Sequence, residues 1–252
     1  MTGNELYNAI FKRKSVRKYE MAPLEEEKIN RVLDFSKGVK TLDDGIKYEL
    51  SFQSSEEVKS LFAVKAPHYI CFYSEKKEGH LANAGFILQQ LDLFLSASGM
   101  GSCWVGMAKP PKEAPQMRNG MEFVIMLAFG NAAEPVHRES ISEFKRNSLS
   151  EITAIKDADQ LLEAARLAPS AANSQPWHIG GNAGELIISR KKLNIIKSQL
   201  YGRLNQVDIG IALCHLWLAG EQQGKRVTIS LKQEEGISCD GEFMAMVRIE
   251  NK

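Results

Sequence analysis

One segment in the second half of the chain combines residue types that suit a planar ligand. Residues 165–177 read ARLAPSAANSQPW, and Pro169 is expected to end a helix at the start of a loop. Small residues follow at 170–172, where they let the backbone approach a flat ring closely. Asn173 and Gln175 add amide donors and acceptors. Few structural roles require small residues, two amides and an aromatic side chain in this order, so the segment predicts a binding loop.

A short basic segment near the start of the sequence offers donors for an anion. Arg13, Ser15 and Arg17 place two guanidinium groups and a hydroxyl within five residues. Arginine presents a rigid fork of donors that matches phosphate oxygens, and serine adds a compact donor. The segment therefore indicates a phosphate contact, with a basic patch exposed to water as the alternative.

A glycine-containing segment follows an apolar run in the first half. Residues 99–106 read GMGSCWVG. A loop of this composition can direct backbone N–H groups toward the edge of a ligand, because glycine permits close approach. The same residues also suit a turn in the core, so both interpretations stay open.

Cysteine and histidine spacing gives no support for a metal site. The four cysteines form no CxxC pair, and the five histidines include no HExxH motif. The first twenty residues lack a signal-peptide core, and the longest mostly apolar stretch, 209–220, is too short to cross a bilayer. We expect reduced thiols, a cytoplasmic location, no metal and no membrane partner.

Composition excludes several classes of protein. Of the 252 residues, 44% are hydrophobic and 25% are charged, which argues against disordered and fibrous chains. The 32 basic and 31 acidic residues leave a net charge of +1, so no overall basic field would attract nucleic acid. The length allows one large domain or two small ones.

The elements that must position these segments follow no regular βαβ order. Helical spacing and start signals predict helices over 4–11, 83–98, 157–167 and 208–223, and one that begins at Pro23. Short apolar runs predict strands over 69–73, 123–129, 185–189, 227–231 and 243–249. This mixture indicates an α+β protein with a mainly antiparallel sheet.

Two pairs of similar segments recur in the same order. Residues 11–16, FKRKSV, resemble 144–149, FKRNSL, at an offset of 133. Asn83-Ala84-Gly85 and Asp208-Ile209-Gly210, at an offset of 125, are each followed by a glycine sixteen residues after their first position. A duplicated half of about 125 residues explains both pairs, with chance similarity as the alternative. Halves 1–140 and 141–252 would pair as a fused pseudo-dimer about an approximate two-fold axis.

Together these segments resemble the flavin-dependent nitroreductase family. Its members carry an Arg-x-Ser-x-Arg motif, matched at 13–17, and an Ala-Pro-Ser-x-x-Asn-x-Gln-Pro-Trp motif, matched at 168–177. They also have a Gly-Leu-Gly-x-x-x-x-Gly segment after a long apolar helix, similar to 99–106. In that family two identical subunits intertwine, and each FMN takes residues from both. The resemblance covers nearly the whole chain and implies a nitroreductase-like α+β fold with helices flanking each sheet.

The family motifs are divided between the halves. The first half has the basic motif and the glycine segment, but its residues 35–38, FSKG, lack the Pro-Ser-Asn signature. The second half has that signature, but residues 146–150, RNSLS, lack the second arginine and residues 224–227, GKRV, lack the glycine segment. In a family homodimer the two kinds of motif meet around one flavin. The resemblance therefore implies one surviving FMN site between the halves.

The resemblance assigns cofactor contacts to fourteen residues. The phosphate and ribityl end is expected to contact Arg13, Lys14, Ser15 and Arg17, together with Lys145 and Arg146. The isoalloxazine ring is expected to lie along Pro169, Ser170, Ala171 and Asn173. The opposite ring edge is expected to contact Cys103, Trp104, Val105 and Gly106, with the N–H of Val105 or Gly106 directed at flavin N5.

The implied activity is that of an FMN-dependent oxidoreductase. Hydride would pass from NADH or NADPH through the flavin to a small electrophile such as a nitroaromatic, quinone or enone, in a ping-pong mechanism. The flavin carries the chemistry, so no side chain is assigned a catalytic role. Alternatives are another flavin reaction, such as reductive dehalogenation or flavin breakdown, and a non-catalytic flavin-binding descendant. We expect a monomer (a pseudo-dimer) or a weak homodimer.

Overall fold

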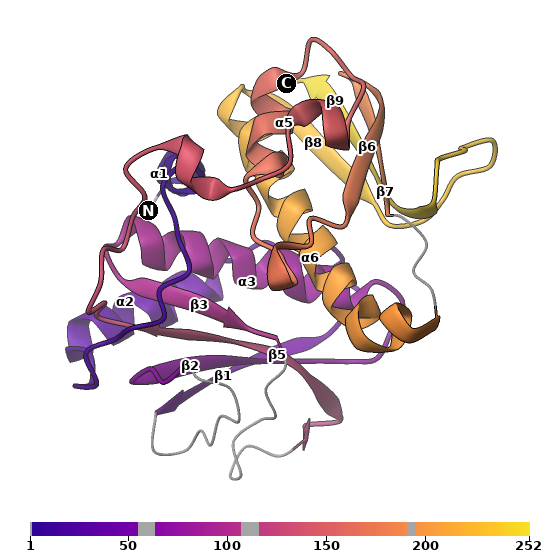
Figure 1. The fold of residues 1–252 in the computed structure, drawn as a ribbon. Coiled ribbons are helices and arrows are strands. Elements are labelled where there is room, and N and C mark those ends of the chain that lie inside the picture. Colours follow the sequence, from indigo (N-terminus) through magenta and orange to yellow (C-terminus); the bar gives the residue numbers. More distant parts are fainter. Residues whose placement is uncertain (1, 55–63, 107–115, 191–194) are drawn as a thin grey trace.

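The first half of the chain forms an antiparallel sheet with helices. The structure is a computed structural model that describes residues 2–54, 64–106, 116–190 and 195–252 (Figure 1). The elements of this half are α1 (Gly3–Ile10), α2 (Glu26–Lys37), β1 (Tyr48–Ser54), β2 (His68–Ser74), α3 (His80–Ala97), β3 (Gly101–Val105), β4 (Met117–Arg118) and β5 (Met121–Gly130). The strand order is β1-β2-β5-β3, and the short β4 also pairs with β5. All these pairs are antiparallel.

The second half forms a second antiparallel sheet. Its elements are the 3-10 turn η1 (Ile141–Phe144), α4 (Leu149–Ile152), α5 (Asp159–Arg166), η2 (Ala171–Asn173), β6 (Trp177–Asn182), β7 (Glu185–Arg190), α6 (Ile195–Gln222), β8 (Lys225–Ser230) and β9 (Glu242–Asn251). The strand order is β6-β7-β9-β8. Apart from β4, the strands of both sheets therefore have the same order. Along the chain, the longest helix of each half follows the second strand of its sheet: α3 lies between β2 and β3, and α6 lies between β7 and β8.

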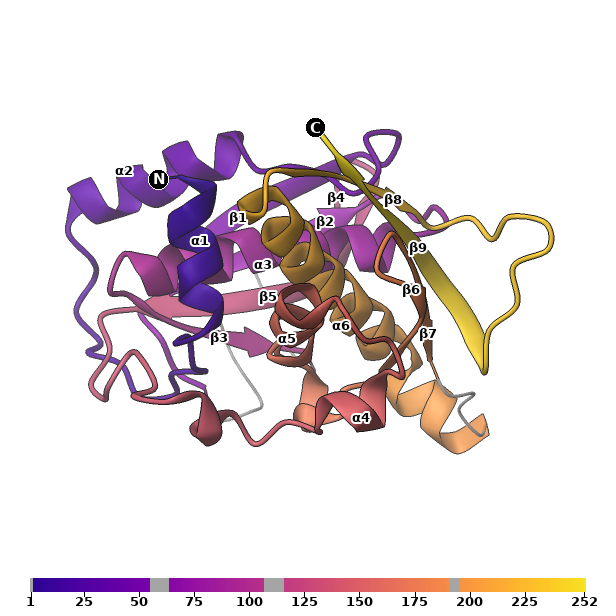
Figure 2. The ribbon, with the colours of Figure 1, turned by 90° about the horizontal axis from the view of Figure 1, so that it is seen from above.

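Two apolar helices join the sheets at the centre of the molecule. Helix α3 packs on the first sheet and α6 on the second, and the two helices pack against each other (Figures 1 and 2). Every residue of α3 from Leu81 to Ser96 is buried. A helix that is apolar on most of its faces needs partners all round, so it lies in the core. One hydrophobic cluster accordingly includes residues of both halves.

The helices α3 and α6 cross where a glycine of each touches the backbone of the other. A Cβ on Gly85 would lie 2.0 Å from the carbonyl oxygen of Val207, and a Cβ on Gly210 would lie 1.9 Å from that of Ala82. The contact is reciprocal, because Ala82 and Val207 each stand three residues before the glycine of their own helix. This approach is possible only because neither glycine has a side chain.

The expected α+β class with antiparallel sheets is confirmed, whereas the expectation for 99–106 is wrong. Residues 101–105 are neither a loop nor a core turn but strand β3, which pairs with β5. Gly99 does end α3 in the left-handed region, with φ +75°. Helix α6 begins at Ile195, well before the expected residue 208. The strands β1, β4 and β6 had no expected counterpart. Tyr48, Leu50 and Phe52 of β1 do alternate with polar residues as in a half-buried strand, whereas β4 has only two residues and β6 contains two glycines.

Three further features concern only the residues that the structure describes. None of their helices is both long enough and apolar enough to cross a membrane. No group of three or more His, Cys, Asp or Glu side chains among them could hold a metal ion. The four cysteines form no disulfide, and three of them are buried.

We expect Gly210→Ala to weaken the chain at the helix crossing. The new methyl group would overlap the Ala82 carbonyl, and two packed backbones cannot move apart cheaply. The free energy of unfolding in urea should fall by about 1–3 kcal/mol or more. Gly3→Ala is the control, since no atom lies within 4 Å of its Cβ position. Equal stability of Gly210→Ala and the wild type would contradict the role of this contact.

Candidate functional site

Two cavities adjoin where the two halves of the chain meet. The apolar cavity, of about 300 Å³, lies among β3, β5, α6 and the loop after α5. The basic cavity, of about 510 Å³, lies between the segment after α1 and residues 138–146 and 169–173. They share five lining residues, Ser15, Arg17, Pro169, Ser170 and Ala172. The two cavities therefore form one cleft with an apolar end and a charged end.

The position of β3 in its sheet opens the apolar cavity. β3 is an edge strand, and the N–H of Val16 donates to the carbonyl of Ser102 (2.9 Å), which covers the start of that edge. Residues 103–106, beyond this bond, line the cavity. Leu204, Val207 and Ile211 of α6 form an apolar wall of the same cavity. Backbone and apolar side chains together make a space suited to a flat, weakly polar ring.

Positive charge dominates the basic cavity. Its cationic lining residues are Arg13, Lys14, Arg17, Arg138, Lys145 and Arg146, and among the described residues Glu143 is its one acidic neighbour. Burial, and to a smaller extent the charge of Arg13, lower the pKa of Arg138 and of Arg146 to about 10. Cations that repel one another in this way would be stabilised by an anion placed among them.

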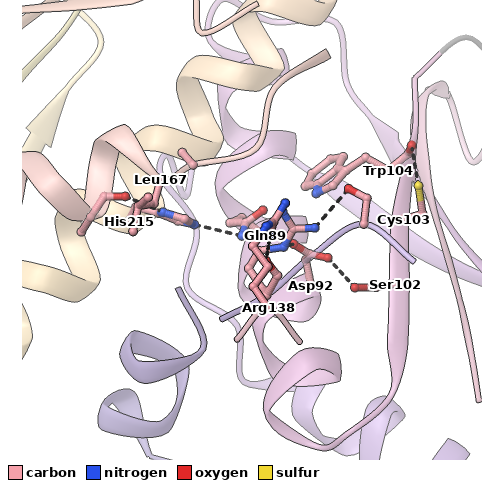
Figure 3. Close-up of polar contacts among 12 residues, drawn as sticks. Gln89, Asp92, Ser102, Cys103, Trp104, Arg138, Leu167 and His215 are labelled. Atoms are coloured by element: carbon pink, nitrogen blue, oxygen red, sulfur yellow. Dashed lines mark hydrogen bonds and ion pairs between the residues drawn. The ribbon is translucent and has the colours of Figure 1, made fainter. Parts of the chain in front are cut away.

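Arg13 is anchored inside the protein rather than exposed to water. Its side chain is 1% exposed, and its Nε lies 3.0 Å from Oδ2 of the buried Asp92 on α3. Ser102 donates to the other carboxylate oxygen of Asp92 (2.5 Å), and Nη2 of Arg13 donates to the hydroxyl of Ser15 (3.2 Å). Figure 3 shows the Asp92–Ser102 part of this network, with Arg138 nearby. The alternative of a fully exposed basic patch is therefore wrong for Arg13, although Arg17 is exposed.

Lys145, Arg146 and Asn173 bind one another across the cleft wall. Arg146 donates from Nη1 to Oδ1 of Asn173 (2.5 Å) and from Nε to the carbonyl of Ala168 (3.1 Å). Asn173 donates from Nδ2 to the carbonyl of Lys145 (3.0 Å). Gln175 accepts from the backbone N–H of the next residue in that segment, Asn147 (2.8 Å). The amides of the predicted binding loop thus fasten it to the basic segment that precedes α4.

The loop after α5 has an unusual backbone. Ala172, Asn173 and Gln175 have φ values of 50°, 55° and 45°, in the left-handed region that residues other than glycine seldom adopt. The hydroxyl of Ser170 accepts from the N–H of Gln175 (2.9 Å) and closes the loop. Such conformations persist only where the surroundings impose them, and they concentrate at binding sites.

Behind the site, His215 connects three helices. Its Nδ1 donates to the carbonyl of Ala164 on α5 (2.8 Å), and its Nε2 accepts from the side-chain amide of Gln89 on α3 (3.0 Å) (Figure 3). Burial lowers the pKa of His215 to about 3, so the ring is neutral and these two bonds fix its tautomer. The network holds the end of α5, from which the binding loop departs.

All fourteen residues expected at the site line the cleft, although their roles in binding stay a prediction. The apolar cavity includes Cys103, Trp104, Val105, Gly106 and Ala171. The basic cavity includes Arg13, Lys14, Lys145, Arg146 and Asn173. Both cavities include Ser15, Arg17, Pro169 and Ser170. The N-terminal basic segment and the Asn173 loop thus lie together, as the resemblance required.

Arg138 and Asp208 are among the cleft residues that sequence reasoning missed. Arg138 lies in a segment of polar composition. Its Cζ lies 4.0 Å from the centre of the Phe144 ring, and nothing in the neighbouring sequence indicated this contact. Asp208 was noted only as part of a repeat. It is a buried carboxyl on α6 that accepts from the N–H of Ala171 (3.0 Å). An acidic residue within a strongly apolar helix was the signal that could have identified it.

Comparison with known proteins places this architecture among characterised folds. A family model described as "Putative TM nitroreductase" matches residues 5–220. A crystal structure from Thermotoga maritima, titled a "putative nitroreductase", has a TM-score of 0.64 and 25% sequence identity, over 97% of this chain and 93% of that one. A nitroreductase family protein from Clostridium difficile 630 has a TM-score of 0.48 and 22% identity, over 60% of this chain and 96% of that one. No curated protein matches the chain.

We expect Asp92→Ala to destabilise the protein strongly. The change leaves the buried guanidinium of Arg13 without its counter-charge, which costs about 3–5 kcal/mol in comparable buried pairs. Chemical denaturation measures the loss. Asp34→Ala is the matched control, because the ion pair between Asp34 and Lys37 is exposed and should contribute almost nothing. A small effect of Asp92→Ala, similar to that of the control, would show that the buried pair does not anchor the segment.

Proposed function

The chain belongs to the nitroreductase family, an oxidoreductase family, and we propose that it is an FMN-dependent oxidoreductase. In this proposal NADH or NADPH is the hydride donor and a small electrophile, such as a nitroaromatic, quinone or enone, is the acceptor, in ping-pong order. The observation that carries the proposal is the cleft between the halves, which joins an apolar cavity to a cationic one. When bound, FMN supplies the redox chemistry, and the chain supplies position and charge.

The chemistry of the cleft supports FMN as its occupant. FMN has a flat, largely apolar ring at one end and a phosphate at the other, which is the same polarity as the two cavities. Burial and the charge of Arg13 lower the pKa of Arg138 and of Arg146, and a phosphate would relieve the repulsion among these three guanidinium groups. Charge-assisted hydrogen bonds from arginine and lysine to phosphate are among the stronger polar contacts in proteins.

We propose direct phosphate and ribityl contacts for four residues that line the basic cavity. These residues are Lys14, Ser15, Arg17 and Lys145. Arg13 and Arg146 add positive charge while Asp92 and Asn173 hold their guanidinium groups. The loop of Pro169, Ser170 and Ala171 would lie along the ring. Residues 103–106 would contact its opposite edge, with the N–H of Val105 or Gly106 toward flavin N5.

We also propose that the chain is a fused pseudo-dimer of halves 1–140 and 141–252. The shared strand order and the reciprocal contact of Gly85 and Gly210 support it. A further correspondence supports it as well. Asn83 Oδ1 accepts from the N–H of Leu42 (2.8 Å) on the loop after α2, as Asp208 Oδ1 accepts from the N–H of Ala171 on the loop after α5.

Because the two halves pair within one chain, we propose a monomer, or at most a weak homodimer, as the working form. The motifs left in each half support one FMN per chain. Cysteines that form no disulfide support a cytoplasmic location.

Flavin binding and reduction test the function. We expect the purified chain to bind one equivalent of FMN, measured by absorbance and by the mass of the released flavin. Anaerobic mixing with NADH or NADPH in a stopped-flow spectrometer should bleach the flavin absorbance, and adding a quinone should restore it. Binding of two equivalents of FMN per chain would contradict the proposal of a single site. A bound flavin that neither NADH nor NADPH bleaches would contradict the proposed reductase activity.

Arg17→Ala tests the phosphate end. Arg17 is exposed and lines both cavities, so its loss should weaken FMN binding without unfolding the chain. A charge-assisted contact of roughly 1.5–3 kcal/mol corresponds to a dissociation constant raised about 10- to 100-fold. Fluorescence titration measures this constant.

Lys18→Ala is a matched control for Arg17→Ala. The backbone N–H groups of both residues donate to the same carboxylate oxygen of Glu134, at 2.7 and 3.3 Å. Lys18 is exposed but lines neither cavity. FMN affinity should therefore stay near the wild-type value in Lys18→Ala. Equal affinities of the two variants would remove Arg17 from the proposed site.

A further inference from the structure

Asp208 is a buried carboxyl in the wall of the apolar cavity. It is 3% exposed, and only one of its oxygens has a hydrogen-bond partner among the described residues. That oxygen, Oδ1, accepts from the N–H of Ala171 (3.0 Å), while Oδ2 is buried without a partner. A buried polar atom that lacks a partner is costly, so such an atom beside a cavity indicates a ligand that completes its bonding.

The surroundings of Asp208 favour its neutral form. The side chains of Val207 and Ile211 line the same cavity, and burial raises the pKa of Asp208 to about 8 against the opposing effect of the Ala171 hydrogen bond. A protonated carboxyl group carries an O–H donor, whereas a carboxylate can only accept.

Among the residues that the structure describes, few ionisable groups face Asp208. Those that line its cavity are Arg17 from the N-terminal segment, Cys103 from β3 and Tyr201 from α6. The loop residues 169–172 bring none, and His80, two residues before Ala82 on α3, lines neither cavity. Arg17, which is exposed, is thus the one cation among the described residues lining this cavity, and it offers little to hold a carboxylate there.

We propose that Asp208 is a cofactor-positioning donor, whose Oδ2–H binds an acceptor atom on the edge of the flavin ring, a carbonyl oxygen or an imine nitrogen. The inference rests on the proposed FMN site and adds to it the residue that recognises the ring. Oδ1 keeps the binding loop in place through Ala171, so one carboxyl group would position both loop and ring. Ionisation would remove the donor and set a negative charge against the acceptor.

The chain contains a natural model for the test variant. Asn83 stands at the position of α3 that corresponds to Asp208 in the repeat, is fully buried, and accepts a backbone N–H through Oδ1 in the same manner. An amide therefore fits this position. Asp208→Asn keeps the acceptor for Ala171 and supplies an N–H donor in place of the O–H, but it cannot ionise.

FMN affinity as a function of pH is the test. We expect wild-type affinity to fall roughly tenfold between pH 7 and pH 9, because only the protonated form donates. Asp208→Asn should bind FMN about as well as the wild type at pH 7 and should lack this fall. The FMN phosphate and the other groups that line the cavity are the same in both proteins, so their effects on the affinity cancel in the ratio of the two affinities.

The outcomes separate the two proposals. Wild-type and Asp208→Asn profiles that run parallel from pH 6.5 to 9.5 would overturn the donor role of Asp208 and leave the FMN site intact. A wild-type chain that binds no FMN at any of these pH values would overturn both the site and the donor. A role confined to holding Ala171 predicts the parallel result, since a carboxylate accepts as well as an amide does.

A measurement without flavin tests the protonation state by itself. A buried acid with a raised pKa binds its proton in the folded state at pH values where the unfolded chain has released it. The stability of the wild type relative to Asp208→Asn should therefore fall as the pH rises from about 4 to about 8, and then stay level. Urea denaturation of the flavin-free proteins measures this difference in stability. If the difference stops changing above about pH 5, the Asp208 carboxyl is not neutral near pH 7 and the inference fails.

Discussion

The backbone contact between α3 and α6 is the constraint from which the rest of the architecture follows. Gly85 and Gly210 bring the two helices together closely enough for each to touch a carbonyl of the other. Each helix carries its own sheet, so this one crossing sets how the two sheets are placed. The cleft lies beside the crossing, and Val207 belongs both to the contact and to the cleft wall. Close packing at the crossing thus determines the width of the site.

The charged end of the cleft is built on internal partners. Asp92 holds Arg13, carbonyl groups and Asn173 hold Arg146, and the Phe144 ring lies under Arg138. These side chains lose their conformational freedom during folding rather than on binding. An anion that enters therefore meets donors and charges already in position, which is the condition for tight recognition by a small site.

Local motifs allowed the sequence to predict the residues of the site better than the elements that carry them. The loop from Pro169 to Gln175 has small residues and amides that act within a few positions, and it was identified without coordinates. Residues 101–105, for which the sequence suggests a loop or a core turn, form a strand because they pair with β5, about 25 residues away. Arg138 and Asp208 gain their environments from segments over 30 residues distant, such as the Arg13 and Ala171 backbones. The composition of a short stretch of sequence does not indicate which distant residues will contact it in the fold.

Because the cleft takes residues from both halves, its occupancy and the integrity of the whole chain are thermodynamically linked. A chain in which either sheet has opened lacks one wall of the cleft and loses its affinity for whatever fills it. By mass action, each tenfold rise in free ligand concentration above the dissociation constant then raises the free energy of unfolding by about 1.4 kcal/mol. When the cleft is full, the two sheets would therefore unfold together as a single cooperative unit.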